Sequence, residues 1–168
     1  MPMIIHIILV LILVVSVANI INLYYNIKNR KVYKTLPMET QLPLELPIIS
    51  LVNNGNVLNF LVDSGSNVSH ICKEYYKSIK SKIIGTYDDE ITSLGTTNKG
   101  ITMCEAKFTD TLGNEYDINL SISKEFTEVA RKFEDSTEVR VHGLLGTDFL
   151  RKYNYVLDFN LLVAYPKN

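Results

Sequence analysis

The sequence predicts a mainly β domain, a small barrel or sandwich, that follows a single membrane-spanning helix. Three observations lead to this prediction. Short apolar runs rich in β-branched residues alternate with turn-forming residues, helical periodicity is confined to brief stretches, and one long apolar run stands near the N-terminus. With 168 residues in total, the chain is expected to form one domain after that run, large enough for a single hydrophobic core.

The long apolar run, residues 3–25, contains no formally charged side chain unless His6 is protonated. As a helix it is long enough to cross a hydrocarbon core of about 30 Å, and its few polar residues do not make the polar face of a soluble helix. It lacks the basic start and the cleavage site of a signal peptide, so we expect it to remain attached. Residues 1–27 are therefore predicted to be a transmembrane anchor that contacts the lipid membrane through residues 3–25.

Charge divides the chain into two parts. The formal net charge is -1, from 17 Lys and Arg against 18 Asp and Glu. Residues 1–34 hold four of the basic residues and no acid, so they carry +4, and the remainder carries 13 minus 18, or -5. Basic residues just after a span favour the cytoplasmic side, so we expect a single-pass protein with a cytoplasmic domain. Without a basic excess in the folded part, binding to nucleic acid is not expected.

Residues 28–43 are predicted to be a basic, proline-containing linker, because Pro37 and Pro43 disfavour helix. The domain proper is then residues 44–168. It begins with a hairpin, since apolar runs at 48–52 and 57–62 flank Asn and Gly residues that accept positive φ. Further strands are predicted over residues 67–72, 90–94, 101–109, 115–121 and 139–142, helices over 73–79, over 124–133 and after Gly146, and a final hairpin over 156–165.

Two apolar strands each end in a small-residue turn that contains an aspartate. The first reads Asp63-Ser64-Gly65, and the second, about eighty residues later, reads Gly-Leu-Leu-Gly-Thr-Asp from Gly143 to Asp148. In this order and at this spacing, the two motifs resemble those of the retropepsin-like aspartic proteases. The resemblance covers residues 44–165 and implies a closed β-barrel with one or two short helices, a single lobe of the acid-protease fold. It implies no cofactor and no metal.

The same resemblance implies that Asp63 is the catalytic residue and that Ser64 and Gly65 support its loop. Peptide hydrolysis by carboxylates needs two Asp side chains close enough to share one proton. The chain has one such motif, so a homodimer is implied in which each copy supplies Asp63. Asp148 matches the turn into a short helix and is given a structural, capping role. For Asp63 alone, a turn-initiating role is the alternative.

Residues 91–102 resemble the flap, a hairpin that closes over bound peptide. An ordinary hairpin turn is the alternative, because the segment is less rich in glycine than viral flaps. The second motif would place a leucine beside the substrate cleft or, equally, wholly in the core. The flap candidates are Leu94, Gly95 and Thr96, and the cleft or core candidates are Gly143, Leu144, Leu145 and Gly146.

The two cysteines, Cys72 and Cys104, have neither disulfide nor zinc-ligand spacing and are expected to be reduced core thiols. Motifs of nucleotide-binding proteins, zinc proteases and serine hydrolases do not occur. The sequence therefore predicts a membrane-anchored aspartic endopeptidase, acting as a homodimer on a peptide or protein substrate. The alternative is a module of the same fold without turnover, which dimerises or binds peptide at the membrane.

Overall fold

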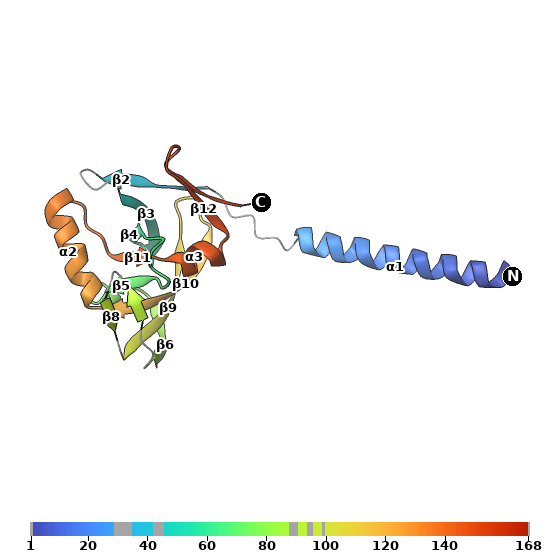
Figure 1. Ribbon diagram of the computed structural model, residues 1–168, viewed down its shortest axis with the longest axis horizontal. Helices are drawn as coiled ribbons and strands as arrows, with labels where there is room; N and C mark the ends of the chain where they lie inside the picture. The colour runs from blue at the N-terminus through green and yellow to red at the C-terminus, as the bar shows by residue number, and fades with distance from the viewer. Residues whose placement is uncertain are drawn as a thin grey trace. The chain divides into compact units, whose positions relative to one another are not determined.

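Figure 1 shows the computed structural model, which contains an N-terminal helix and a mainly β domain. The structure describes residues 2–28, 35–41, 46–87, 91–93, 96–98 and 100–167. The backbone forms two compact units, Met1–Val32 and Tyr33–Asn168. Each unit is described by itself.

The first unit contains the helix α1 (Pro2–Lys28). Proline is tolerated at the first helical position, where its missing N–H would have no partner in the helix. The described side chains, residues 12–25, are all exposed. Among the described residues, no helix is both long enough and apolar enough to cross a membrane. The predicted transmembrane anchor is therefore not supported by the structure.

The second unit is built on an eight-stranded sheet in the order β2-β3-β4-β11-β5-β10-β9-β6. An additional pairing of β3 with β9, at Val52 and Thr109, closes the six strands from β3 to β9 into a barrel. The predicted mainly β fold with a closed barrel is thus confirmed. The strands are β2 (Glu39–Gln41), β3 (Leu46–Asn53), β4 (Asn56–Val62), β5 (His70–Cys72), β6 (Ser81–Tyr87), β9 (Ile101–Thr109), β10 (Glu115–Ser123) and β11 (Gly143–Leu145).

Two smaller sheets and three helical segments complete the described part of this unit. The chain termini of the domain meet in a three-stranded sheet of order β1-β13-β12, and β7 pairs with β8. These strands are β1 (Leu36–Pro37), β7 (Ile91–Ser93), β8 (Thr96–Asn98), β12 (Tyr155–Asp158) and β13 (Val163–Pro166). The helical segments are α2 (Glu125–Thr137), α3 (Thr147–Lys152) and a 3-10 turn, η1 (Tyr76–Ser78).

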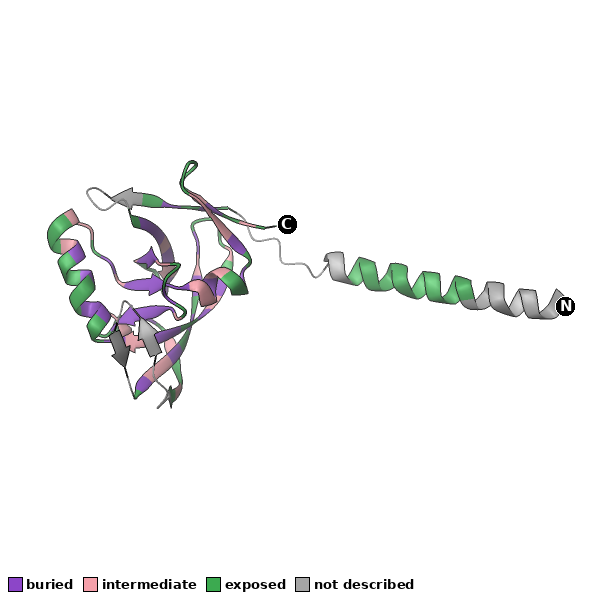
Figure 2. Ribbon diagram, in the orientation of Figure 1, coloured by how far each residue is buried: buried purple, intermediate pink, exposed green. Residues whose placement is uncertain are grey.

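Buried residues follow the strands of the barrel, as Figure 2 shows. The barrel interior holds aromatic side chains, among them Phe60 and Phe108, whose rings meet edge to face with centroids 5.3 Å apart. A second apolar cluster lies beneath α2, which buries Phe126, Ala130 and Phe133. Their spacing of three or four residues places them on one face of the helix, and α2 packs with this face against the outer side of the sheet.

Two predicted elements differ from the structure. Residues 139–142 form no strand. The His142 N–H donates to Asn59 O at 2.8 Å, but the Asn59 N–H donates to the side chain of His142, at Nδ1 and 3.0 Å, instead of to a backbone carbonyl, which interrupts a ladder with β4. The strand forms one step later, as β11. The helix predicted over 73–79 is reduced to η1, because the N–H of Lys73 donates to Ser123 O of β10 and so ties the start of this segment to the sheet.

Two stretches of sheet lie outside the predicted elements. β1 and β2 fall within the predicted linker, but they pair with β13 and β3, so the folded unit includes residues before 44. Proline is compatible with such short edge strands, where one N–H needs no partner. The strand β6 was not predicted, since its apolar run is short and interrupted by Gly85, where the pairing with β9 shifts register.

Candidate active site

Asp63 directly follows β4, which pairs in parallel with β11 in the middle of the sheet. Val62 lies opposite Leu145, and the N–H of Asp63 donates to Leu145 O at 3.0 Å. The two motifs, far apart in the sequence, are therefore adjacent strands in the structure. The position of Asp63 is fixed by the backbone of the second motif.

The loop after β4 holds the Asp63 carboxylate by its own backbone. The N–H of Gly65 donates to Asp63 Oδ1 at 2.8 Å, and the N–H of Ser66 donates to Asp63 O at 3.2 Å. A Cβ on Gly65 would lie 3.1 Å from Oδ1, so glycine permits this close approach. Asp63 is half-buried, while Ser64 and Gly65 are exposed. Within the described residues, this carboxylate accepts no other hydrogen bond, so it remains available to a ligand.

Asp148 has a different environment, although its motif resembles that of Asp63. Its carboxylate accepts from the N–H of Ser69 at 3.0 Å, from Ser69 Oγ at 2.7 Å and from the N–H of Phe149 at 2.8 Å. The N-cap of α3 is Gly146, so Asp148 lies inside the first turn rather than at the cap position. The Asp148 carboxylate thus binds both the N–H and the hydroxyl of Ser69, and these hydrogen bonds connect α3 to the loop that follows Asp63.

The glycines of the second motif allow close packing around this brace. A Cβ on Gly143 would lie 2.5 Å from His70 O, and one on Gly146 would lie 2.8 Å from Val68 O. Leu144 and Leu145 are fully buried, each in one of the two apolar clusters. The predicted roles were a place beside the substrate cleft or a place in the core, and in the structure both leucines lie in the core.

The flap prediction falls mostly beyond the described residues. Leu94 and Gly95 lie outside them. Thr96 begins β8 and pairs with Ser93 of β7, so a hairpin forms where the sequence predicts one. The closing role of that hairpin remains a prediction.

A pocket of 380 Å³ lies beside Asp63, between β4 and α2. No pattern in the sequence predicts this pocket. Its walls are apolar, with Lys132 and Ser136 as the polar side chains besides Asp63. The one residue that could have indicated the pocket is Val129. It is apolar and follows the helical spacing of the buried face of α2, but it lies at the edge of that face and is 40% exposed. The apolar lining consists of Leu46, Leu61, Val62, Phe126, Val129, Ala130, Phe133 and Val141.

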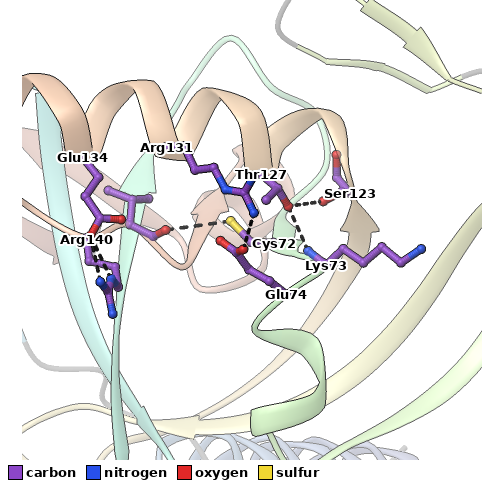
Figure 3. Close-up of polar contacts among 9 residues, drawn as sticks. Cys72, Lys73, Glu74, Ser123, Thr127, Arg131, Glu134 and Arg140 are labelled. Carbon is purple, nitrogen blue, oxygen red and sulfur yellow. Dashed lines mark hydrogen bonds and ion pairs between the residues drawn. The ribbon is translucent and has the colours of Figure 1, made fainter.

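The wall formed by α2 is tied to the segment that follows β5, as Figure 3 shows. Thr127 Oγ1 accepts from the N–H of Lys73 at 3.1 Å and donates to Ser123 O at 2.9 Å. One turn later, Arg131 pairs with Glu74 at 2.8 Å. Backbone and side-chain contacts thus connect α2, which forms one wall of the pocket beside Asp63, to the segment after β5.

Burial controls the titratable groups behind the site. His70 is buried between the Asp63 loop and α2, and its ring stacks on Phe126 with centroids 6.2 Å apart. Burial lowers the pKa of His70, and the nearby carboxylates of Asp148, Asp63 and Glu125 oppose this shift. The imidazole is therefore held neutral over a wider pH range than an exposed histidine.

Both cysteines are free and buried, as predicted. Burial raises the pKa of Cys72 to about 12 and that of Cys104 to about 11, so both thiols stay protonated near neutral pH. Within the described part of the chain, no group of three or more His, Cys, Asp or Glu side chains is placed to hold a metal ion.

Comparison with known proteins gives structural matches only. No protein-family model matches the chain, and a search of curated proteins finds no match. Among solved structures, EIAV protease complexed with the inhibitor HBY-793 is similar, with 17% identity, 68% of this chain and 93% of that chain covered, and a TM-score of 0.45. A retropepsin-like aspartic protease from Rickettsia conorii shows 17% identity, covers 78% of this chain and 89% of that chain, and has a TM-score of 0.47. At these identities and scores, the geometry of the site itself is the evidence on function.

Proposed function

We propose that this protein is an aspartic endopeptidase whose active form is a homodimer. The observation that carries the proposal is the difference between the two aspartates. Asp63 follows a central strand and begins a tight loop, and its carboxylate accepts one hydrogen bond among the described residues, beside an apolar pocket. Asp148 is occupied by three hydrogen bonds. A single chain therefore supplies one available carboxylate, and a second copy is needed for a pair.

The chemistry follows from two Asp63 side chains that face each other across a two-fold axis. Like charges this close cannot both ionise, so the pair holds one proton. The ionised carboxylate takes a proton from a water molecule, whose oxygen attacks the scissile carbonyl carbon. The protonated carboxylate donates to the carbonyl oxygen, and the tetrahedral intermediate collapses with proton transfer to the leaving amine. Substrate peptides with a large apolar side chain suit the pocket next to Asp63.

The test uses the variant Asp63→Asn, which keeps the shape of the side chain but cannot ionise. We expect cleavage of a peptide library, followed by mass spectrometry, to fall by about a thousandfold or more. The matched control is Asp135→Asn, the same chemical change at an exposed position of α2, which should cleave like the wild type. Cleavage that persists in Asp63→Asn would contradict the proposal. Loss of cleavage in both variants would show that the loss is not specific to the Asp63 carboxylate, and it would also contradict the proposal.

The shared dyad has its own test, since mixed dimers hold only one Asp63. Wild-type chain is mixed with an equal amount of Asp63→Asn chain at constant total concentration and allowed to exchange subunits. If both aspartates are needed, activity falls to about one quarter of that of pure wild type, because random pairing leaves that share of intact dimers. A fall to only about one half would mean that each chain works alone. We also expect a bell-shaped pH profile, which reports the pair rather than either residue.

We also propose that residues 3–25 attach the domain to a membrane, with the domain on the cytoplasmic side. The support is the uncharged apolar run and the four basic residues that follow it at positions 28, 30, 31 and 34. Alkaline carbonate extraction of cell membranes should leave the chain in the pellet. A reporter fused after Asn168 should be active only in the cytoplasm, and an external signal would overturn this orientation.

A further inference from the structure

The strand β6 is at one end of the sheet order, next to β9, and none of its residues belongs to the Asp63 loop. Among the described residues it pairs only with β9, and Figure 1 shows it at the lower margin of the barrel. Its seven residues therefore present a backbone edge with no strand beside it in the described structure. Free edges of this kind are templates for strand addition.

The side chains of β6 are unusual for an exposed strand. Ile83 and Ile84 are adjacent and are 45% and 39% exposed. The pairing of β6 with β9 shifts register between Ile83 and Gly85, so Ile84 lies in a bulge, and both isoleucines are exposed at this irregularity. Exposed apolar groups beside an open backbone edge are features of a surface that a partner covers.

The segment that leads into β6 is basic, although residues 35–168 carry -5 overall and residues 88–90, which follow β6, are all acidic. Between positions 73 and 82 there are four exposed lysines and one acid, Glu74, which is already paired with Arg131. No lysine in this stretch takes part in an ion pair among the described residues. These lysines are Lys73, Lys77, Lys80 and Lys82.

Two hollows adjoin the strand and combine this charge with apolar surface. One, of 550 Å³, is lined by Lys73, Lys77 and Lys124 around Ile83, with Glu125 as its one acid. The other, of 660 Å³, is of mixed charge, because Lys80, Lys82 and Lys107 line it together with Glu105 and Asp117. Neither hollow includes a residue of the Asp63 loop. This surface is therefore separate from the pocket beside Asp63.

We propose that β6 and the lysine-rich hollow beside Ile83 are a docking site for an extended acidic segment of a partner protein, which adds to β6 as a further strand. Backbone hydrogen bonds would supply the pairing, and alternating acidic and apolar side chains would meet the lysines and isoleucines. A second copy of this chain fits the hollow less well, because β6 itself contains Lys82 and no acid, so its own side chains offer no negative charge to Lys73 and Lys77. The docking site does not depend on cleavage.

The test measures binding to the full chain in detergent micelles, carrying Asp63→Asn so that no probe is cut. The probe is a fluorescein-labelled peptide of alternating Glu and Val, of about seven residues to match a strand, and fluorescence anisotropy gives the Kd. We expect binding that weakens with salt, and no binding of the corresponding Lys and Val peptide. The double variant Lys77→Glu/Lys82→Glu should weaken binding by about tenfold.

The matched control is Lys132→Glu, the same charge reversal at the pocket beside Asp63, which should leave the Kd unchanged. Equal weakening by Lys132→Glu would place the probe at that pocket and overturn the proposal. The proposal would also be overturned if the acidic peptide did not bind and phosphatidylserine vesicles protected Lys82 from a lysine-acylating reagent. That result would show that the surface binds lipid. All these outcomes are independent of whether Asp63 is catalytic.

Strand addition is tested by hydrogen exchange and by N-methylation of the probe. The peptide should slow amide exchange in residues 81–87. Only every second N–H of the bound peptide points toward β6. Methylation of that set of peptide nitrogens should therefore abolish binding, while methylation of the other set should not. Binding that protects no β6 amide, or that tolerates both methylated peptides equally, would show a merely electrostatic contact and contradict strand addition.

Discussion

Asp63 and Asp148 lie in similar stretches of sequence, each an apolar strand that ends in a turn with small residues, yet the environments of the two carboxylates are opposite. Asp63 accepts one backbone hydrogen bond and is half-buried beside a pocket. Asp148 accepts three hydrogen bonds, two of them from Ser69. The difference indicates that the first motif presents an available carboxylate and that the second motif stabilises the loop around it. The second aspartate holds the loop so that the first can remain open to a ligand.

This comparison is sharpened most by Asp63→Asn, for which we expect the thousandfold loss of cleavage described above with little change in stability. The carboxylate of Asp63 accepts only the N–H of Gly65, and an asparagine oxygen can accept the same bond. In urea denaturation its free energy of unfolding should stay within about 0.5 kcal/mol of wild type, as for other substitutions that remove no packing. A large loss of stability would mean that Asp63 also has a supporting role.

The variant Asp148→Ala should behave in the opposite way. It removes three hydrogen bonds to a carboxylate and leaves the N–H and Oγ of Ser69 without their partner. We expect the free energy of unfolding to fall by about 3 kcal/mol, measured by urea denaturation. Asp135→Ala, at an exposed position, is the control and should be neutral. A neutral Asp148→Ala would remove the supporting role from the second motif.

Substitution of one glycine in each motif by alanine should also have different effects in the two motifs. A Cβ on Gly143 would meet His70 O at 2.5 Å in the buried sheet, so Gly143→Ala should cost about 2 kcal/mol of stability. Gly65 is exposed, and its Cβ would meet only the Asp63 carboxylate, at 3.1 Å. Gly65→Ala should therefore lower cleavage more than stability. The reverse pattern, with stability lost at Gly65, would contradict the division of roles.

The smallest effect is expected from His70, which is behind both motifs. Its pKa is lowered in the folded state by burial, so the unfolded chain takes up the proton first as the pH falls below about 6.5. The native state then loses stability toward lower pH, until the folded pKa is reached. In His70→Gln this contribution is absent, so the slope of stability against pH between 7 and 5 should be shallower by at most about 1.4 kcal/mol per pH unit.

His142 provides the internal control for this measurement. Burial lowers its pKa as well, with the nearby charge of Arg140 acting in the same direction. Some pH dependence should therefore remain in His70→Gln. An unchanged slope would mean that His70 is already open to water in the folded state.

Much of this architecture follows from local sequence. The first hairpin, the long strands β9 and β10, the helix α2 and the final hairpin all have periodic apolar residues bounded by turn residues, and they form as predicted. The apolar run before Asp63 also placed β4, whereas β11 forms at Gly143–Leu145, after the predicted strand over residues 139–142. Elements with weak local patterns were less predictable: β6 depends on pairing with β9, and the segment at 139–142 is decided by a side-chain contact with β4.

By itself, the sequence determined the mainly β class and drew attention to Asp63. Tertiary structure decided which of the two aspartates is available, because that depends on whether Ser69, a residue from another part of the chain, occupies the carboxylate. It also decided the pocket between β4 and α2 and the open edge of β6. The physical reason is the same in each case. Strand and helix propensities are local, whereas a free carboxylate, a cavity and a sheet edge are defined by contacts between distant residues.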